Sequence, residues 1–159
     1  MHFEDYVPGA RTEHPATLTV DQAAVIEFAE QFDPQYFHVD PVAAADGPFK
    51  GLVASGWHTA GLMMRLYADQ YLSKVASLGG PGVDELRWLA PVRPGDVLRL
   101  RTEVLEARPS KSKPDRGLVR TRAELLNQDD AVVFSCIVLN LLAVRPQYSE
   151  SPRMETEVE

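Results

Sequence analysis

The spacing of the apolar residues changes once along this chain, and that change limits the possible folds more than any other feature. Up to about Leu72 the apolar residues recur at helical spacing, whereas beyond the break at 79–82 they alternate with polar residues. Helices followed by a run of strands indicate an α+β domain with an antiparallel sheet and not a βαβ fold. One long apolar helix with four long strands suggests a sheet that curls around that helix, although other folds with helices packed on a sheet fit the same pattern.

Two helices are expected before the long one. Residues 19–32 carry one apolar stripe, and Thr19 is expected to cap this helix with Gln22 as its capping-box partner. Asp40-Pro41 is typical of the cap and first residue of a helix, which predicts a short helix over 42–45. The first half of the chain is therefore mainly helical.

The longest expected helix covers residues 55–72, and its first half is apolar nearly all round, which is typical of a buried helix. Half-buried strands are expected where apolar and polar residues alternate beyond it. They lie at 85–90, 98–104 and 119–125. The last segment, 132–144, is apolar on both faces, so we expect both of its faces to be covered.

The size of the chain is that of one domain, since it has 159 residues. We expect a single domain over residues 1–144 and a polar, mobile tail over 145–159. The formal net charge of −7 argues against a nucleic-acid partner, because binding to phosphates needs an excess of Lys and Arg.

The features that report on cellular location favour the cytoplasm. The N-terminal residues lack the apolar core of a signal peptide, and no apolar run is long enough to span a bilayer. The single cysteine, Cys136, cannot form an internal disulfide and is expected in the core. We therefore expect a cytoplasmic protein without a membrane contact.

An acidic and an imidazole side chain lie five positions apart, across the break that follows the first helix. Pro34 follows Asp33 directly, and the aromatic residues Tyr36 and Phe37 come just before His38. Such a pair can hold one water molecule between its members and transfer protons near neutral pH. The alternative is a capping Asp and an unrelated, hydrogen-bonded His.

A possible donor to a negatively charged oxygen lies at the start of the long helix. The backbone N–H of Gly56 would point along the helix dipole, where it can stabilise an oxyanion. A thioester enolate needs such a donor, so Gly56 together with Asp33 and His38 would suffice to add water across an enoyl thioester. The alternative role for this glycine is tight packing alone.

The segment from Asp33 to His38 resembles the D-x-N-P-x-H motif of the MaoC-like dehydratases and R-specific enoyl-CoA hydratases. In that family the Asp and His are catalytic, and a later H-G segment, here Ser55-Gly56, opens the central helix. Gln35 and Tyr36 replace the Asn and Pro of the motif, and Ser55 stands where a His often occurs. The resemblance covers residues 17–144, including the turn Pro91–Asp96.

The resemblance implies a hot-dog fold, in which an antiparallel sheet wraps around a long central helix. It also implies reversible hydration of a trans-2-enoyl-CoA to an (R)-3-hydroxyacyl-CoA, without a cofactor or a metal, in a homodimer whose sheets join edge to edge. The substrate would be an acyl thioester of CoA or of acyl carrier protein. The residues expected to contact it are Tyr36, Phe37, Ser55, Trp57, Met63, Met64, Lys111 and Lys113.

Lys111 and Lys113 belong to the one concentrated basic stretch, which runs from Arg108 to Arg116. They are candidates to bind the phosphates of CoA by charge-assisted hydrogen bonds. The alternative for this stretch is a solvated hairpin loop.

Two other functions fit the same fold. A hot-dog thioesterase would hydrolyse the acyl thioester, but these enzymes use a carboxylate at the central helix, and residues 47–68 contain no Asp or Glu. A non-catalytic acyl-CoA-binding protein is the third possibility, favoured by the change at Gln35-Tyr36. A metal site formed by His38, Asp40 and His58 is conceivable but is not needed for the reaction.

Overall fold

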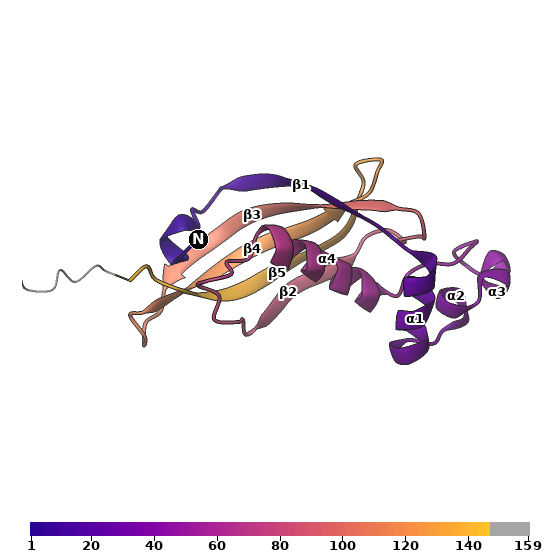
Figure 1. Cartoon of the computed structure of the whole chain (residues 1–159), viewed down its shortest axis with the longest axis horizontal. Helices are drawn as coiled ribbons and strands as arrows, with labels where there is room; N and C mark the ends of the chain where they lie inside the picture. Colours follow the sequence, from indigo (N-terminus) through magenta and orange to yellow (C-terminus); the bar gives the residue numbers. More distant parts are fainter. Residues whose placement is uncertain (147–159) are drawn as a thin grey trace, which may run out of the picture.

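A five-stranded antiparallel sheet in the order β1-β3-β4-β5-β2 curls around one long helix, α4, in the computed structural model of the protein (Figure 1). The structure describes residues 1–146, so most of the expected tail lies outside the described residues. The elements are η1 (Phe3–Asp5), β1 (Arg11–Thr19), α1 (Gln22–Phe32), α2 (Tyr36–Val39), α3 (Pro41–Asp46), α4 (Gly56–Gln70), β2 (Gly82–Trp88), β3 (Val97–Pro109), β4 (Arg116–Leu126) and β5 (Val132–Ala143). The expected α+β class and hot-dog architecture are confirmed.

Helix α4 begins at the position that the sequence indicates but is buried on one side only. The Ser55 hydroxyl caps it by accepting a hydrogen bond from the Trp57 N–H. The buried face of the helix consists of Thr59, Met63, Leu66 and Tyr67. Trp57 and Met64 are 61% and 41% exposed, so the expectation of a buried helix holds on one side only. The sheet can cover only the side of the helix that faces it, which leaves the opposite side free.

The N-terminal segment forms a strand that the sequence did not indicate. Residues Arg11–Thr19 pair with β3 as an edge strand, with a register shift between Glu13 and Thr17 where Pro15 lies. Proline lacks a donor for the sheet and is tolerated at such an edge irregularity. The expected cap at Thr19 is wrong, because Thr19 ends β1 and Asp21 caps α1 by accepting from the Ala24 N–H.

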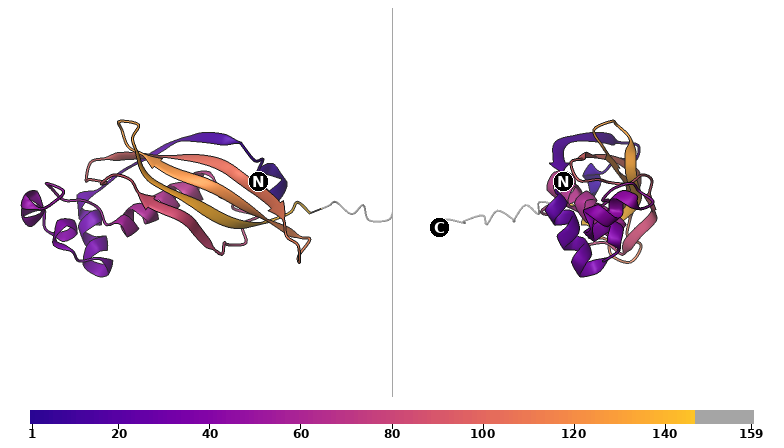
Figure 2. Two further views of the ribbon diagram at one scale, coloured as in Figure 1. Left: turned by 180° about the vertical axis from the view of Figure 1, so that it is seen from behind. Right: turned by 90° about the vertical axis from the view of Figure 1, so that its right-hand side faces the viewer.

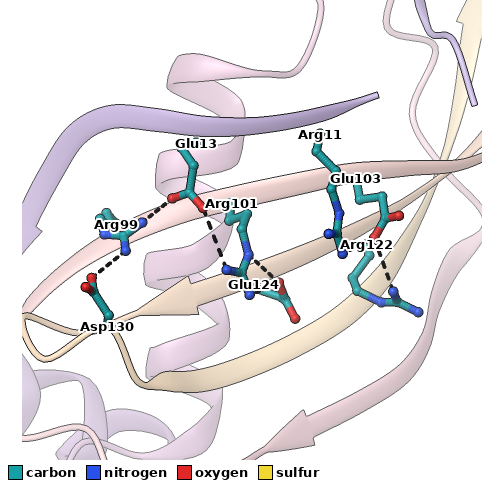
Figure 3. A network of polar contacts seen from close by, with 8 residues as sticks. All are labelled: Arg11, Glu13, Arg99, Arg101, Glu103, Arg122, Glu124 and Asp130. Carbon is teal, nitrogen blue, oxygen red and sulfur yellow. Dashed lines mark hydrogen bonds and ion pairs between the residues drawn. The ribbon is translucent and has the colours of Figure 1, made fainter. Parts of the chain in front are cut away.

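The outer face of the sheet carries a network of ion pairs (Figure 3). In β3 the buried Leu98, Leu100 and Thr102 face α4, so the alternating Arg99, Arg101 and Glu103 face outward. The pairs run across strands, as between Arg101 and Glu124 at 2.8 Å. Exposed pairs of this kind each contribute only about 0–1 kcal/mol, so the interior supplies most of the stability.

Strand β5 is buried on the face toward α4, whereas β2 forms an exposed edge. On the other face of β5 Ile137 is buried but Ser135, Leu139 and Leu141 are only partly buried, so the expectation that both faces are covered is wrong for most of the outer face. Val83 and Trp88 of β2 are 50% and 47% exposed, although β2 was expected to be half-buried like the other strands. The reason is that β2 pairs only with β5 and leaves its other edge open.

The two ends of the molecule are formed by different elements. Helices α1–α3 lie at one end, and the N-terminus and the β3–β4 hairpin lie at the other (Figures 1 and 2). At the second end Phe3 packs on Gly117, and Arg145, the first residue of the expected tail, pairs with Asp5 at 2.7 Å. Among residues 1–146 no helix has the length and apolar character needed to cross a membrane.

Candidate active site

A cleft of about 450 Å³ opens where α1 and α2 meet the start of α4 and the connection between β2 and β3. Its position is set by the end of α1, since Pro34 stops the helix and the short α2 turns the chain back toward the sheet. The lining residues are Asp33, Gln35, Phe37, His38, Phe49, Val53, Ala54, Gly56, Trp57, Thr59, Trp88, Leu89, Ala90, Pro91 and Val92. Most of the lining is apolar or aromatic, with an acid and an imidazole at one side.

The structure brings Asp33 and His38 together in this cleft. Asp33 ends α1, His38 is buried in α2, and the distance from His38 Nε2 to Asp33 Oδ2 is 3.4 Å. The other ring nitrogen, Nδ1, lies 2.6 Å from the carbonyl oxygen of Val53. A carbonyl oxygen can only accept, so Nδ1 carries the proton and, in the neutral ring, Nε2 is an acceptor.

Two further side chains hold the Asp33 carboxylate. The Gln35 amide donates to Oδ1 and the Ser55 hydroxyl donates to Oδ2, each at 2.7 Å. Partial burial acts to raise the pKa of Asp33, but the hydrogen bonds from Gln35 and Ser55 and the neighbouring His38 outweigh it, so the pKa lies below its ordinary value. Asp33 is therefore ionised at neutral pH.

Gly56 lies at the first turn of α4, beneath the ring of Trp88. The Trp88 Nε1–H donates to the Gly56 carbonyl oxygen at 2.7 Å. A Cβ atom at position 56 would lie only 2.5 Å from the Trp88 ring, so no larger residue fits without moving that ring. The N–H groups of a first helical turn have no partner within the helix, which leaves the Gly56 N–H available to a ligand oxygen in the cleft.

The other residues expected to bind substrate are not all in the cleft. Phe37 and Trp57 line it. Ser55 is fully buried behind Asp33, and Tyr36 is exposed outside the lining.

The methionines and lysines among these candidates also lie away from the cleft. Met63 belongs to the core and Met64 faces outward. Lys111 and Lys113 lie in the β3–β4 hairpin, at the end of the molecule opposite to the cleft.

The sequence reasoning missed several residues of the cleft. Thr59 and Phe49 line it, as does the segment Leu89–Val92. Thr59 follows Ser55 by one helical turn, and this spacing could have indicated that it lies on the same side of α4. Nothing in the local sequence indicates that the β2–β3 connection reaches the cleft. Gln35 was visible only as a departure from the motif.

Three residues that were considered as metal ligands have other contacts. His38 donates to Val53, and Asp40 caps α3 by accepting from the N–H groups of Val42 and Ala43. The ring of His58 is stacked on Phe28 of α1, with a centroid distance of 4.8 Å. Within residues 1–146 no three His, Cys, Asp or Glu side chains converge as metal ligands would.

Because His58 of α4 is packed on Phe28 of α1, the free energy of unfolding should depend on pH. Burial lowers the pKa of His58, and likewise that of His14, below the ordinary value. The unfolded chain then binds protons more readily, so the free energy of unfolding is highest above about pH 6.5 and falls as the pH drops below that value. We expect a lower urea midpoint at pH 5 than at pH 7.5, and a smaller difference in His58→Met. If the urea midpoints at pH 5 and pH 7.5 differ as much in His58→Met as in the wild type, this role for His58 is excluded.

Residues 5–127 match the MaoC like domain. The chain belongs to the MaoC-like dehydratase family. The structure resembles the crystal structure of the MaoC-like dehydratase from Rhodospirillum rubrum with a TM-score of 0.85 and 41% sequence identity, covering 92% of this chain and 99% of that chain.

Two curated proteins illustrate the range of relatives that the chain matches. The uncharacterized protein YdeM of Bacillus subtilis is 30% identical over 118 residues, which cover 74% of this chain and 82% of that protein. The 3-hydroxyacyl-thioester dehydratase Z of Mycobacterium tuberculosis is 36% identical over 90 residues, which cover 55% of this chain and 60% of that protein. The alignment thus spans less than two thirds of the dehydratase.

Proposed function

We propose that this protein hydrates trans-2-enoyl thioesters, and dehydrates (R)-3-hydroxyacyl thioesters in the reverse direction. The observation that carries the proposal is the approach of Asp33 and His38 to 3.4 Å in a mainly apolar cleft that also contains Gly56. The name of the related 3-hydroxyacyl-thioester dehydratase describes the same type of reaction.

The hydrogen bonds of the pair suggest which member transfers the proton. Asp33 is ionised and His38 presents Nε2 as an acceptor, so a water molecule between them would donate one hydrogen to each. As the water oxygen bonds to C3, its proton passes to His38 Nε2, and the carboxylate stabilises the resulting imidazolium. The π electron pair moves to the thioester oxygen, which accepts a hydrogen bond from the Gly56 N–H. His38 then returns the proton to C2, which restores the thioester and the neutral ring.

A single assay separates this proposal from the two other functions. Incubation with trans-2-butenoyl-CoA should consume the enoyl absorbance without release of a free thiol, and chiral analysis should find the (R)-3-hydroxy product. Release of thiol would instead indicate a thioesterase. Binding of acyl-CoA without any turnover would indicate a non-catalytic protein.

Replacing Ser55 by Ala should shift the pH dependence of activity. The hydroxyl helps to keep Asp33 ionised, so its loss should raise the pKa of Asp33 and move the acidic limb of the kcat/KM profile to higher pH, with kcat lower by about 10-fold. Ser73→Ala is a matched control, because Ser73 is also buried and caps backbone N–H groups but lies far from the cleft. A profile unchanged in Ser55→Ala would contradict this role of Ser55.

We also propose that two copies join through the open edge of β2. The β2 edge exposes the large apolar residues Val83, Trp88 and Leu89 beside the charged Asp84, Glu85 and Arg87, whereas the opposite edge, β1, exposes the charged Arg11 and Glu13 and no large apolar side chain. An unpaired edge with exposed large apolar side chains is a natural place for a second strand. Trp88 and Leu89 line the cleft, so a partner at this edge would cover the mouth of the active site.

Light scattering after size-exclusion chromatography tests this dimer. Val83→Lys should convert the dimer to a monomer, because it replaces an apolar side chain of the proposed contact by a charged one. Val42→Lys adds the same charge at a residue that is 82% exposed on α3, so it should leave the dimer intact. A wild-type protein that is monomeric at all concentrations would exclude the contact.

A further inference from the structure

We propose that Lys50 and Arg93 form a phosphate-binding site at the rim of the cleft, and that this site holds the phosphates of a CoA carrier. The choice of ligand rests on the proposed function. The two residues follow Phe49 and Val92 in the chain, and both of these neighbours line the cleft. The Arg93 guanidinium donates from Nη2 to the Phe49 carbonyl oxygen at 2.6 Å, which ties the two segments together.

Arg93 differs from most arginines of the protein because its guanidinium has no acidic partner. Nine of the eleven arginines among residues 1–146 pair with a carboxylate. Asp96, the acidic residue nearest to Arg93 in the chain, accepts hydrogen bonds from the Arg93 backbone N–H and from Gln128 instead. The guanidinium therefore keeps donors that a phosphate can use in its planar, forked geometry.

The backbone conformation of Lys50 also favours a ligand site at this position. Lys50 has a φ of 56°, a left-handed conformation that is uncommon for a residue with a side chain. The turn is held by the hydrogen bond from the Lys50 N–H to the Gly47 carbonyl oxygen at 3.1 Å and by Arg93 on Phe49. Such strained positions concentrate at ligand sites. Lys50 forms no ion pair with any residue from 1 to 146, so its charge is available to a ligand.

The charges around the cleft explain why these two cations matter. Residues 21–49, which form the helical end beside the cleft, contain six Asp and Glu residues and no Lys or Arg. A ligand with several phosphates is repelled by such a surface unless local cations offset it. Lys50 and Arg93 supply positive charge at the rim of the cleft. Lys111 and Lys113 lie at the opposite end of the molecule.

The experiment compares one acyl group on two thiols. The trans-2-butenoyl group is presented on CoA and on N-acetylcysteamine, which has the same thioester but no phosphate. The wild type should have a lower KM for the CoA thioester, and added salt should reduce the difference. Lys50→Gln, Lys50→Gly and Arg93→Gln should each raise the KM for the CoA thioester by about 3- to 10-fold and leave the KM for the cysteamine thioester unchanged.

Two variants control for folding and for total charge. Lys50→Gly relieves the left-handed backbone, so its thermal midpoint should equal or exceed that of the wild type. Because Arg93 also supports the turn at Phe49, the Lys50 variants decide the outcome. Lys74→Gln makes the same charge change just beyond the C-terminal end of α4 and should leave both KM values unchanged.

Several results would overturn the proposal. They are equal KM values for the two thioesters in the wild type, an equal increase of both in the Lys50 variants, or a CoA-specific increase only when Lys111 and Lys113 are replaced. If the wild type hydrates neither thioester, the proposed function fails, and calorimetric titration with CoA still decides the rim site. Tight CoA binding that Lys50→Gln weakens would support the site, and binding that is absent or unaffected would exclude it.

Discussion

Asp33→Asn and His38→Gln should each lower kcat for hydration of trans-2-butenoyl-CoA by at least about 100-fold. Asn at position 33 cannot carry the charge that stabilises an imidazolium on His38, whose Nε2 lies 3.4 Å from Oδ2. Glutamine at position 38 retains an amide donor for the buried Val53 carbonyl oxygen but cannot take up a proton. The fold should survive both changes, which circular dichroism and thermal denaturation can check.

Asp40→Asn is the matched control for the change at position 33. Asp40 lies two residues beyond His38 and caps α3, and Asn is a comparably good N-cap, so this variant should keep its activity and stability. If Asp33 and His38 act on the same water molecule, the double variant should be little slower than either single variant. Full activity in Asp33→Asn or His38→Gln would exclude the proposed chemistry.

Local signals place Asp33 and His38 on a short segment between two helices, because Pro34 ends α1 and Asp40-Pro41 begins α3. Their pairing was expected from the resemblance to the MaoC-like motif, since the local pattern alone also fits a capping Asp and an unrelated His. The donors that hold Asp33 could not be derived in the same way. Ser55 is 22 residues away in the chain and was expected to face the substrate, yet its hydroxyl points to Asp33.

The elements that the sequence reasoning missed or misjudged depend on contacts between distant segments. Strand β1 is polar and interrupted by Pro15, so only its pairing with β3 makes it a strand. Met64 was expected near the substrate because of its place in the central helix of the family that the sequence resembles, but the side of a helix that faces the core is decided by where the sheet lies. Likewise, the exposure of Trp88 follows from the place of β2 at the end of the strand order.

Gly56→Ala should destabilise the protein by about 1–3 kcal/mol and reduce kcat/KM by about 100-fold. The added methyl group would lie 2.5 Å from the Trp88 ring, so the ring must move and its hydrogen bond to the Gly56 carbonyl oxygen must break. Gly61→Ala is the matched control on the same helix, because a Cβ at that position would meet no atom within 4 Å apart from its chain neighbours and the backbone of its own helix. There the substitution should be neutral or stabilising by up to about 1 kcal/mol.

The double variant Gly56→Ala/Trp88→Ala separates the steric effect from the role of the backbone N–H. Removal of the indole makes room for the methyl group, so urea denaturation should find the double variant more stable than Gly56→Ala alone. Alanine keeps the N–H that is proposed to bind the thioester oxygen, so part of the lost kcat/KM should return as well. Recovery of stability with no recovery of kcat/KM would indicate that the Trp88 ring itself, and not only the N–H of residue 56, is needed to orient the thioester.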